Sequence, residues 1–418
     1  MRSRRFRLTR TAILASALTL VVAATAISCN GAGTTTGAPA TTKPPASTTK
    51  PATGPGATPA ARRGVYAGAS AGALSEQARL ARQLVYVPNT RSNDVSVIDP
   101  RTYRVVDRFD VGREPQHVVP SADLSTLWVN DDLSNDLVPI APRTGRRGKA
   151  VDVDDPYNLY FTPDGQHALV MAERLRRIDV RDPRTMRLQR SIDVPCAGVN
   201  HADFTADGSW LLVSCEFSGK LLVIPSTLDR VVGAIDLNSI RTPGAIDPAM
   251  AKSMGGPARS LAKGASAMPQ DVRLTDDGTS FVVADMLRGG VWVVDVATRR
   301  VATFVPTGAG THGIYPSRDA TRLFVSNRDA GSISVLDARG RKVIATWQLP
   351  KGSSPDMGGV TVDGSELWLS GRYDGVVYVI ATADGRLMHT IDVGSGPHGL
   401  LVWPQPGSRS LGHTGNMR

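Results

Sequence analysis

Four of the seven histidines in this chain belong to a series, together with an aspartate, an asparagine and a methionine, in which all intervals but one are 41 to 45 residues. The series is His117, Asn158, His201, Asp271, His312, Met357 and His398. Imidazole, carboxylate and thioether groups are metal ligands, and His combined with Met suits copper. Imidazoles also donate hydrogen bonds to polar or anionic ligands. If these side chains meet, they predict a metal site or a polar ligand pocket.

Each of these residues opens one copy of a repeat. The layout is a short apolar strand, an Asp-Gly-like turn, a second strand, a polar turn, a third strand ending near Asp, and a fourth strand. "HADFTADGSWLLVSCEFSGKLLVIP" (201–225) and "DVRLTDDGTSFVVADMLRGGVWVVD" (271–295) show it most clearly. The gaps between landmarks are 41, 43, 70, 41, 45 and 41 residues, so the long gap predicts an insertion at 238–268.

Seven repeats of about 40 residues with four strands each are typical of a seven-bladed β-propeller. The stretch 84–112 has three strands and lacks the first, whereas 397–404 supplies one strand and no more. Pairing the two closes the ring and leaves no exposed strand edge. We therefore predict an all-β propeller of antiparallel blades over residues 84–404, with 405–418 as a disordered tail.

The first strand of every propeller blade lines the central channel, so the landmark residues should form a ring at its mouth. They would bind a ligand there, or His117, His201, His312 and His398 would hold a metal. A purely structural interpretation stays open, in which each imidazole caps its strand and bonds a neighbouring blade. Metal ligands must come within about 2.0–2.2 Å of zinc, and a seven-bladed channel keeps opposite strands apart. Neighbours such as His117 and His398 could still meet.

The N-terminus predicts export. Residues 1–28 have a basic head and an apolar run, and the run ends in Ala26-Ile27-Ser28-Cys29, a lipoprotein-like cleavage box that would place a lipid on Cys29. An uncleaved anchor helix is the alternative. Residues 29–70, dominated by Thr, Pro, Ala and Gly, should be a disordered tether, and 71–83 a short helix or linker. We expect a membrane-anchored protein outside the cytoplasm, at the cell envelope.

Two cysteines remain once Cys29 is assigned to lipid. The Asp207-Gly208 turn brings Cys215 level with Asn200, one loop away from Cys196. An exported protein can oxidise such a pair, which predicts a disulfide, with a shared metal site as the alternative.

Composition narrows the function classes. The net charge of +10 falls to about +5 without the signal, and the aromatic content of 5% gives little stacking surface, so nucleic-acid binding has weak support. The sequence has no C-x-x-C-H, P-loop or H-E-x-x-H motif. The absence of these motifs argues against covalently bound haem and against nucleotide hydrolysis. We therefore favour a monomeric binding protein over an enzyme.

"YVPN" followed by "NDVSVIDPRTYRVVDRFDVG" resembles the YVTN repeat, with Pro88 in place of its Thr, and "LFVSNRDAGSISVLDA" (323–338) is a second copy. The resemblance covers residues 84–404 and implies a seven-bladed propeller. Proteins of this family include cell-surface proteins and a periplasmic protein that binds single-stranded DNA. Related propellers carry cofactors in amine dehydrogenases, nitrous oxide reductase and haem-d nitrite reductases.

These observations predict an envelope binding or scaffold module, with an unknown protein or small-molecule ligand at the channel mouth. One alternative is a redox propeller whose histidine ring holds copper or a haem-d-like cofactor. A hydrolase or lyase of the lactonase-like propeller type is the other, although no clustered acid and metal site supports it in the sequence.

Overall fold

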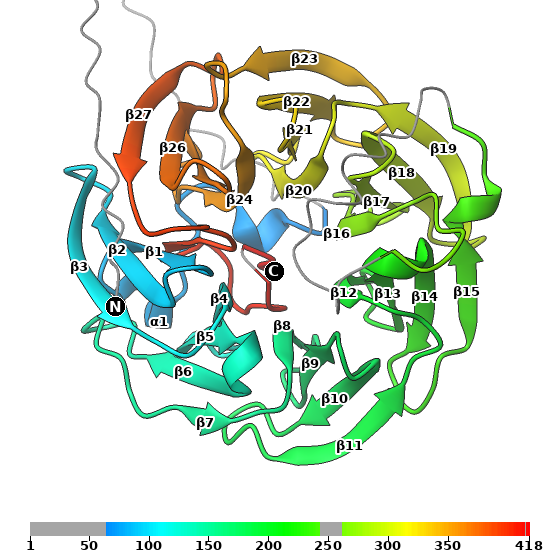
Figure 1. Cartoon of the computed structure of the whole chain (residues 1–418), viewed down its shortest axis with the longest axis horizontal. Coiled ribbons are helices and arrows are strands. Elements are labelled where there is room, and N and C mark those ends of the chain that lie inside the picture. Colours follow the sequence, from blue (N-terminus) through cyan, green and yellow to red (C-terminus); the bar gives the residue numbers. More distant parts are fainter. Residues whose placement is uncertain (1–63, 243–260, 414) are drawn as a thin grey trace, which may run out of the picture. The chain divides into compact units, whose positions relative to one another are not determined.

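Seven four-stranded antiparallel sheets make up the domain. The structure is a computed structural model that describes residues 64–242, 261–413 and 415–418. Figure 1 shows the sheets standing as blades around a common axis, with the first strand of each repeat nearest the axis and the fourth at the rim. The seven-bladed propeller predicted from the repeat is confirmed.

Six blades use four consecutive strands, and the seventh joins the two ends of the repeat array. In chain order the strands of the first three complete blades are β4 (Pro115–Pro120), β5 (Leu127–Asp131), β6 (Asp136–Ile140) and β7 (Val151–Asp152), then β8 (Pro156–Phe161), β9 (Ala168–Ala172), β10 (Arg177–Arg181) and β11 (Leu188–Asp193), then β12 (Val199–Phe204), β13 (Trp210–Cys215), β14 (Lys220–Pro225) and β15 (Gly233–Asp236). The next three are β16 (Pro269–Leu274), β17 (Ser280–Asp285), β18 (Gly290–Asp295) and β19 (Arg300–Pro306), then β20 (Thr311–Pro316), β21 (Arg322–Asn327), β22 (Ser332–Asp337) and β23 (Val343–Gln348), then β24 (Pro355–Val360), β25 (Glu366–Gly371), β26 (Val376–Ala381) and β27 (Leu387–Asp392).

The ring closes through β28 (Leu401–Trp403), which pairs with β1 (Leu84–Asn89); β2 (Asp94–Asp99) and β3 (Arg104–Asp110) complete that blade. The pairing is antiparallel, with Leu84 opposite Trp403. Trp403 is 1% exposed and belongs to a buried apolar cluster that includes residues of β1, β5 and β6. The closure predicted from the sequence therefore holds, and it protects an edge that would otherwise be free to pair with another chain.

The position of a strand within its blade determines its composition. Inner strands such as β13 (WLLVSC) are buried along their whole length, because both faces of the sheet pack against neighbouring blades. Rim strands such as β3 (RVVDRFD) are exposed at nearly every residue. The Asp-Gly turns between first and second strands are fixed locally. Asp207, for example, accepts hydrogen bonds from the Thr205 hydroxyl (2.6 Å) and the Ser209 N–H (3.0 Å), while Gly208 supplies the φ of +69°.

Cys196 and Cys215 form a disulfide, with their Cα atoms 6.1 Å apart. The bond ties the loop before β12 to the end of β13 and encloses a loop with a sequence separation of 19 residues. Both side chains lie in the apolar cluster between two neighbouring blades.

Replacing both cysteines with serine is expected to lower the free energy of unfolding by about 3 kcal/mol, because the unfolded chain regains the entropy of that loop. Urea unfolding followed by circular dichroism measures the difference. Reducing the wild-type protein should give the same loss, and a loss below about 1 kcal/mol in both cases would contradict a stabilising role for the bond.

The segment before the ring packs on the channel rather than extending away from it. It contains η1 (Ala67–Ala69) and the short helix α1 (Glu76–Arg79). Tyr66 is 6% exposed and its hydroxyl donates to the Leu274 carbonyl at 2.7 Å. Residues 64–70 therefore differ from the disordered tether expected there. The predicted signal peptide, Cys29 and the remainder of the tether lie outside the described residues. Within the described part of the chain, no helix has the length and apolar character needed to cross a membrane.

The C-terminal segment differs most from its prediction. In place of a disordered tail, residues 405–418 are mostly buried, apart from residue 414, which is not described. Gly412 pairs with Tyr160 of β8, and the Arg418 guanidinium contacts both carboxylate oxygens of Asp203 at 2.9 and 3.1 Å. The C-terminus lies in the middle of the ring in Figure 1. The segment was missed because its few apolar side chains, such as Leu411 and Met417, give no periodic pattern.

Three short 3₁₀ turns complete the described elements: η2 (Asp132–Ser134), η3 (Glu216–Ser218) and η4 (Leu237–Ser239). Of the predicted insertion at 238–268, residues 238–242 and 261–268 are described. Leu261 packs against a small buried cluster that contains Phe217, Met268, Met286 and Leu287.

Candidate functional site

The sequence landmarks occupy two neighbouring levels of the channel, not one. The pairing of inner strands fixes the equivalence, since Pro115 lies opposite Asp131, Thr311 opposite Asn327 and Pro397 opposite Asn89. The two residues that follow each of these paired residues are here named the channel segment of the strand. His312 and His398 are the first residue of their channel segments. The second residue is occupied by His117, Asn158, His201, Asp271 and Met357.

The prediction of a single equivalent position is therefore wrong. Repeat lengths of 41 to 45 residues left a one-residue ambiguity in the sequence alignment. The structure removes it through the ladder pairing, in which a register shift spans the channel segment of six blades, as between Thr311 and Ile314. Because the shift breaks the strict alternation of side chains, residues of both levels can reach the channel.

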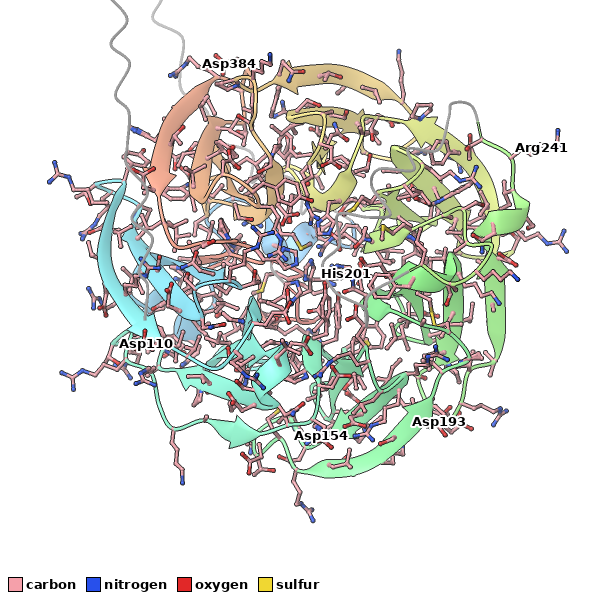
Figure 2. All side chains as sticks on the ribbon, in the orientation of Figure 1. Asp110, Asp154, Asp193, His201, Arg241 and Asp384 are labelled. Atoms are coloured by element: carbon pink, nitrogen blue, oxygen red, sulfur yellow. A yellow bond between two sulfur atoms is a disulfide. The ribbon has the colours of Figure 1, made fainter. Side chains whose placement is uncertain are left out.

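Five histidines meet in the channel interior, including one that the sequence did not predict. Ring centroids are 5.0 Å apart for His117 and His398, 5.6 Å for His398 and His312, 6.2 Å for His312 and His201, and 6.0 Å for His201 and His117. His413, from the C-terminal segment, lies 4.6 Å from His201 and 5.3 Å from His117. All five are at most 2% exposed. Figure 2 places His201 near the middle of the ring.

Glycine makes room for this cluster on the closing strand. Gly399 occupies the level of His117 in its own blade, and a Cβ added there would lie 2.1 Å from His117 Cδ2. A side chain at Gly399 would displace the imidazole of His117. Packing of the cluster therefore requires glycine at this position.

On one side of the cluster, Asp356 binds two of the imidazoles. Its carboxylate oxygens lie 2.7 Å from His398 Nδ1 and 2.9 Å from His312 Nδ1, and Arg328 reaches it through Nε and Nη2. Burial alone would raise the pKa of Asp356, but Arg328 and the two histidines hold it well below its usual range. The sequence pointed instead to Met357, one residue further on, which is buried and donates its backbone N–H to Ser370 Oγ.

On the other side lies a group suited to a metal ion. His201, Asp271 and His413 each offer a ligand atom, and these atoms all lie within 4.8 Å of one another. His413 Nε2 is 3.6 Å from Asp271 Oδ1, close to the roughly 3.4 Å that separates two ligands of a tetrahedral ion with bonds near 2.1 Å. Of the four histidines predicted to hold a metal, only His201 belongs to this group.

His117 stands beside that group, and His312 and His398 are turned to Asp356. His117 Nδ1 lies 3.0 Å from the Tyr157 carbonyl, and its Nε2 has no hydrogen-bond partner among the described residues. Asn158, the remaining predicted site residue, places Nδ2 3.2 Å from His201 Nδ1. Asp356 and His413 were not predicted, because the sequence pattern around each of them is only a weak indication of a site. Asp356 directly precedes a landmark, and His413 lies in a Gly-rich segment outside the repeats.

The imidazoles are neutral at physiological pH. Burial lowers the pKa of His117 to about 3 and that of His312 to about 4. It also lowers the pKa of His201, His398 and His413 well below the usual value. Burial raises the pKa of Asp271, although Arg273 opposes the shift. Neutral imidazole is the form that binds metals.

Replacing His117 with Gln should make the free energy of unfolding of the metal-free protein fall less steeply as the pH is lowered. The folded-state pKa of about 3 lies below the unfolded value of 6.5, so as pH falls through this window the unfolded chain takes up the proton first and stability is lost. From pH 6 to pH 4 the wild type should lose about 2.5 kcal/mol more than the variant. Urea unfolding in EDTA at each pH measures this, and parallel profiles would refute it.

Comparison with known proteins supports the fold. Among curated protein sequences, none matches this chain. Solved structures with a similar fold include hydrazine synthase from Kuenenia stuttgartiensis (18% identity, TM-score 0.56, covering 73% of this chain and 94% of that one). A functionally unknown protein from Desulfotomaculum acetoxidans has 14% identity and a TM-score of 0.58, covering 76% of this chain and 98% of that one. Dihydro-heme d1 dehydrogenase NirN in complex with DHE has 15% identity and a TM-score of 0.55, covering 78% and 77%.

These identities are low enough that the likeness speaks for the fold and for nothing else. The sequence itself is more informative about family. A model of the YNCE-like β-propeller family matches residues 56–184 and 247–406, which is more than half of the chain. With seven blades and a closing strand in place, this chain belongs to the YNCE-like β-propeller family.

Proposed function

We propose that this propeller binds one transition-metal ion inside its channel, with His201, Asp271 and His413 as ligands. The observation that carries the proposal is the convergence of two neutral imidazoles and one carboxylate within 4.8 Å, all at most 1% exposed. Two histidines and one carboxylate form a donor set that suits iron(II), zinc or copper and leaves coordination positions open.

His117 is the natural fourth ligand. Two imidazoles bound to one tetrahedral ion have ring centroids about 5.2 Å apart, since each centroid lies roughly 3.2 Å from the metal. The centroids of His117, His201 and His413 are separated by 4.6 to 6.0 Å. His117 Nε2, which has no hydrogen-bond partner among the described residues, would be the ligand atom.

Neighbouring groups already hold the ligands in orientation. Asp271 accepts a hydrogen bond from the Ile314 N–H at 2.9 Å, and Arg273 Nη2 lies 3.2 Å from the same carboxylate oxygen. His201 Nδ1 lies near Asn158 Nδ2 and the Tyr160 hydroxyl, which leaves Nε2 for the metal. Such outer contacts fix ring orientation and typically contribute 10- to 100-fold to metal affinity.

We place this site in an exported protein, anchored through lipid on Cys29. The disulfide between Cys196 and Cys215 supports an oxidising compartment. The binding module expected from the sequence would thus take a metal in the channel interior instead of a ligand at the channel mouth, where the C-terminal segment packs. Copper, one of the ions considered from the sequence, fits the nitrogen ligands, although Met357 is not among them.

Elemental analysis of the full chain, isolated after export, tests the proposal. We expect about one equivalent of copper, zinc or iron per chain, removable by chelation and restored by titration. A metal-free protein that binds none of these ions more tightly than about 10 μM would overturn it, since structural and catalytic sites with such ligands bind far more tightly.

A further inference from the structure

One loop at the outer edge of the ring departs from the repeat. Residues 141–150, between β6 and β7, form a connection of ten residues, whereas the equivalent connections of the other six blades have four to seven. The strand that follows it, β7, has only two residues. The loop contains four basic residues and no acidic one, and most of it is exposed. The other blades form without such a loop, so its length and charge are not requirements of the fold.

The segment that precedes the ring lies against this loop. Arg82 donates its backbone N–H to the Pro142 carbonyl at 3.0 Å and its Nη1 to the Thr144 carbonyl at 3.1 Å. Ala78 of α1 is buried in the apolar cluster that also contains Ile140 at the end of β6, and α1 lies beside β6 in Figure 1. The exposed cations of these two adjoining segments are here named the basic patch: Arg79, Arg82, Arg143, Arg146, Arg147 and Lys149.

A surface cavity of about 480 Å³ lies between the two segments. Three residues of the basic patch line it, Arg82, Arg146 and Arg147. The described lining includes one acidic residue, Asp107, and the side chain of Val106, which stands on β3 and is 52% exposed. Three guanidinium groups against one carboxylate give the cavity a positive charge at physiological pH.

The charges of the basic patch are not neutralised by the protein. None of its six side chains forms an ion pair with a carboxylate of the described residues. Other exposed arginines are paired, as Arg101 is with Asp99 at 2.7 Å. Like charges gathered on adjoining segments repel one another, so a partner with many negative charges would stabilise their arrangement.

The basic patch lies on the face of the ring at which the described chain begins. In an antiparallel blade, the connection between the first two strands and the connection between the last two lie at the same end. The loop 141–150 is a connection of the second kind, and the turn that contains Asp276 is one of the first kind. Val65, next to the first described residue, donates its N–H to the Asp276 carbonyl at 2.8 Å. A lipid on Cys29 would therefore tether the domain from this face.

We propose that the basic patch docks the propeller on a membrane surface rich in anionic phospholipids. Guanidinium groups bind phosphate through paired hydrogen bonds, so a headgroup phosphate would enter the cavity between Arg82, Arg146 and Arg147. The other cations of the patch would lie over neighbouring headgroups. The lipid on Cys29 would keep the domain near the bilayer, and the patch would orient it there. The inference rests on the export and lipid attachment proposed above and not on metal binding.

Vesicle co-sedimentation tests this proposal on the full chain with Cys29→Ser, which carries no lipid of its own. Each basic residue near an anionic surface strengthens binding about fivefold, so Arg82→Gln/Arg146→Gln/Arg147→Gln should bind vesicles with about 30% phosphatidylglycerol about 100-fold more weakly than the parent chain. The control Arg339→Gln/Arg341→Gln/Arg386→Gln changes the net charge equally at exposed turns of other blades and should bind as the parent does. Both variants share the basic N-terminus, so the difference between them reports the patch alone.

Equal losses in the two triple variants, or no loss in either, would overturn the proposal. So would tighter binding of the parent chain to single-stranded DNA than to the anionic vesicles, if the patch variant removed it, because the patch would then serve nucleic acid. Should the patch variant not fold, Arg143→Gln/Lys149→Gln leaves the cavity lining intact and should weaken vesicle binding about 20-fold. Zinc binding, measured on the same samples, should be unchanged in every variant, so a failure of the metal site is distinguished from a failure of the membrane contact.

Discussion

Replacing His413 with Ala should lower the affinity of the full chain for Zn²⁺ by about 100-fold or more, since one of the three ligands that already converge within 4.8 Å is removed and no other described imidazole lies as close to both His201 and Asp271. Competition with a chromophoric chelator measures this affinity. Asp271→Asn keeps the size of the side chain but removes the anionic ligand, and it should cause a loss of similar size.

The surface residue His167 provides the control, because it contacts Gln189 and lies outside the channel. His167→Ala should bind Zn²⁺ as the wild type does. Unchanged affinity in both His413→Ala and Asp271→Asn, with folding intact by circular dichroism, would eliminate the proposed ligand set. A loss confined to His117, His312 and His398 variants would instead favour the four-histidine set predicted from the sequence.

Deleting residues 397–418 is expected to abolish cooperative folding of the whole ring. The deletion removes β28, leaves β1 as an open edge and exposes the partners of Leu400, Leu401 and Trp403, which are at most 1% exposed. Burial of each such side chain contributes about 1.5–3 kcal/mol, and domains of this kind have only about 5–15 kcal/mol of stability in total. Urea unfolding followed by circular dichroism and tryptophan fluorescence would report the loss.

A chain ending at Pro404 is the matched control, because it keeps β28 and removes only the C-terminal segment with His413. It should retain a cooperative transition, at lower stability, while losing Zn²⁺ binding. If the longer deletion unfolds with the same midpoint and cooperativity as the intact chain, ring closure does not hold the domain together.

Much of the architecture is determined by local signals that recur. Asp-Gly turns such as Asp207-Gly208 and largely apolar inner strands such as β13 depend on neighbours close in sequence, so they can be recognised without the fold. Their period of about 40 residues then predicts the number of blades, and the incomplete repeat at 84–112 predicts the closing strand. The Cys196–Cys215 pair follows from the same hairpin register.

Only the tertiary structure decided which side chains meet in the channel. A one-residue shift between blades exchanges Met357 for Asp356 as a site residue, and repeat spacing alone does not resolve such a shift because bulges change the register locally. His413 is brought to His201 by a segment with no strand pattern, through contacts with residues more than 200 positions away, such as Asp203 with Arg418. Those contacts depend on the completed ring, so they leave no periodic trace in the sequence.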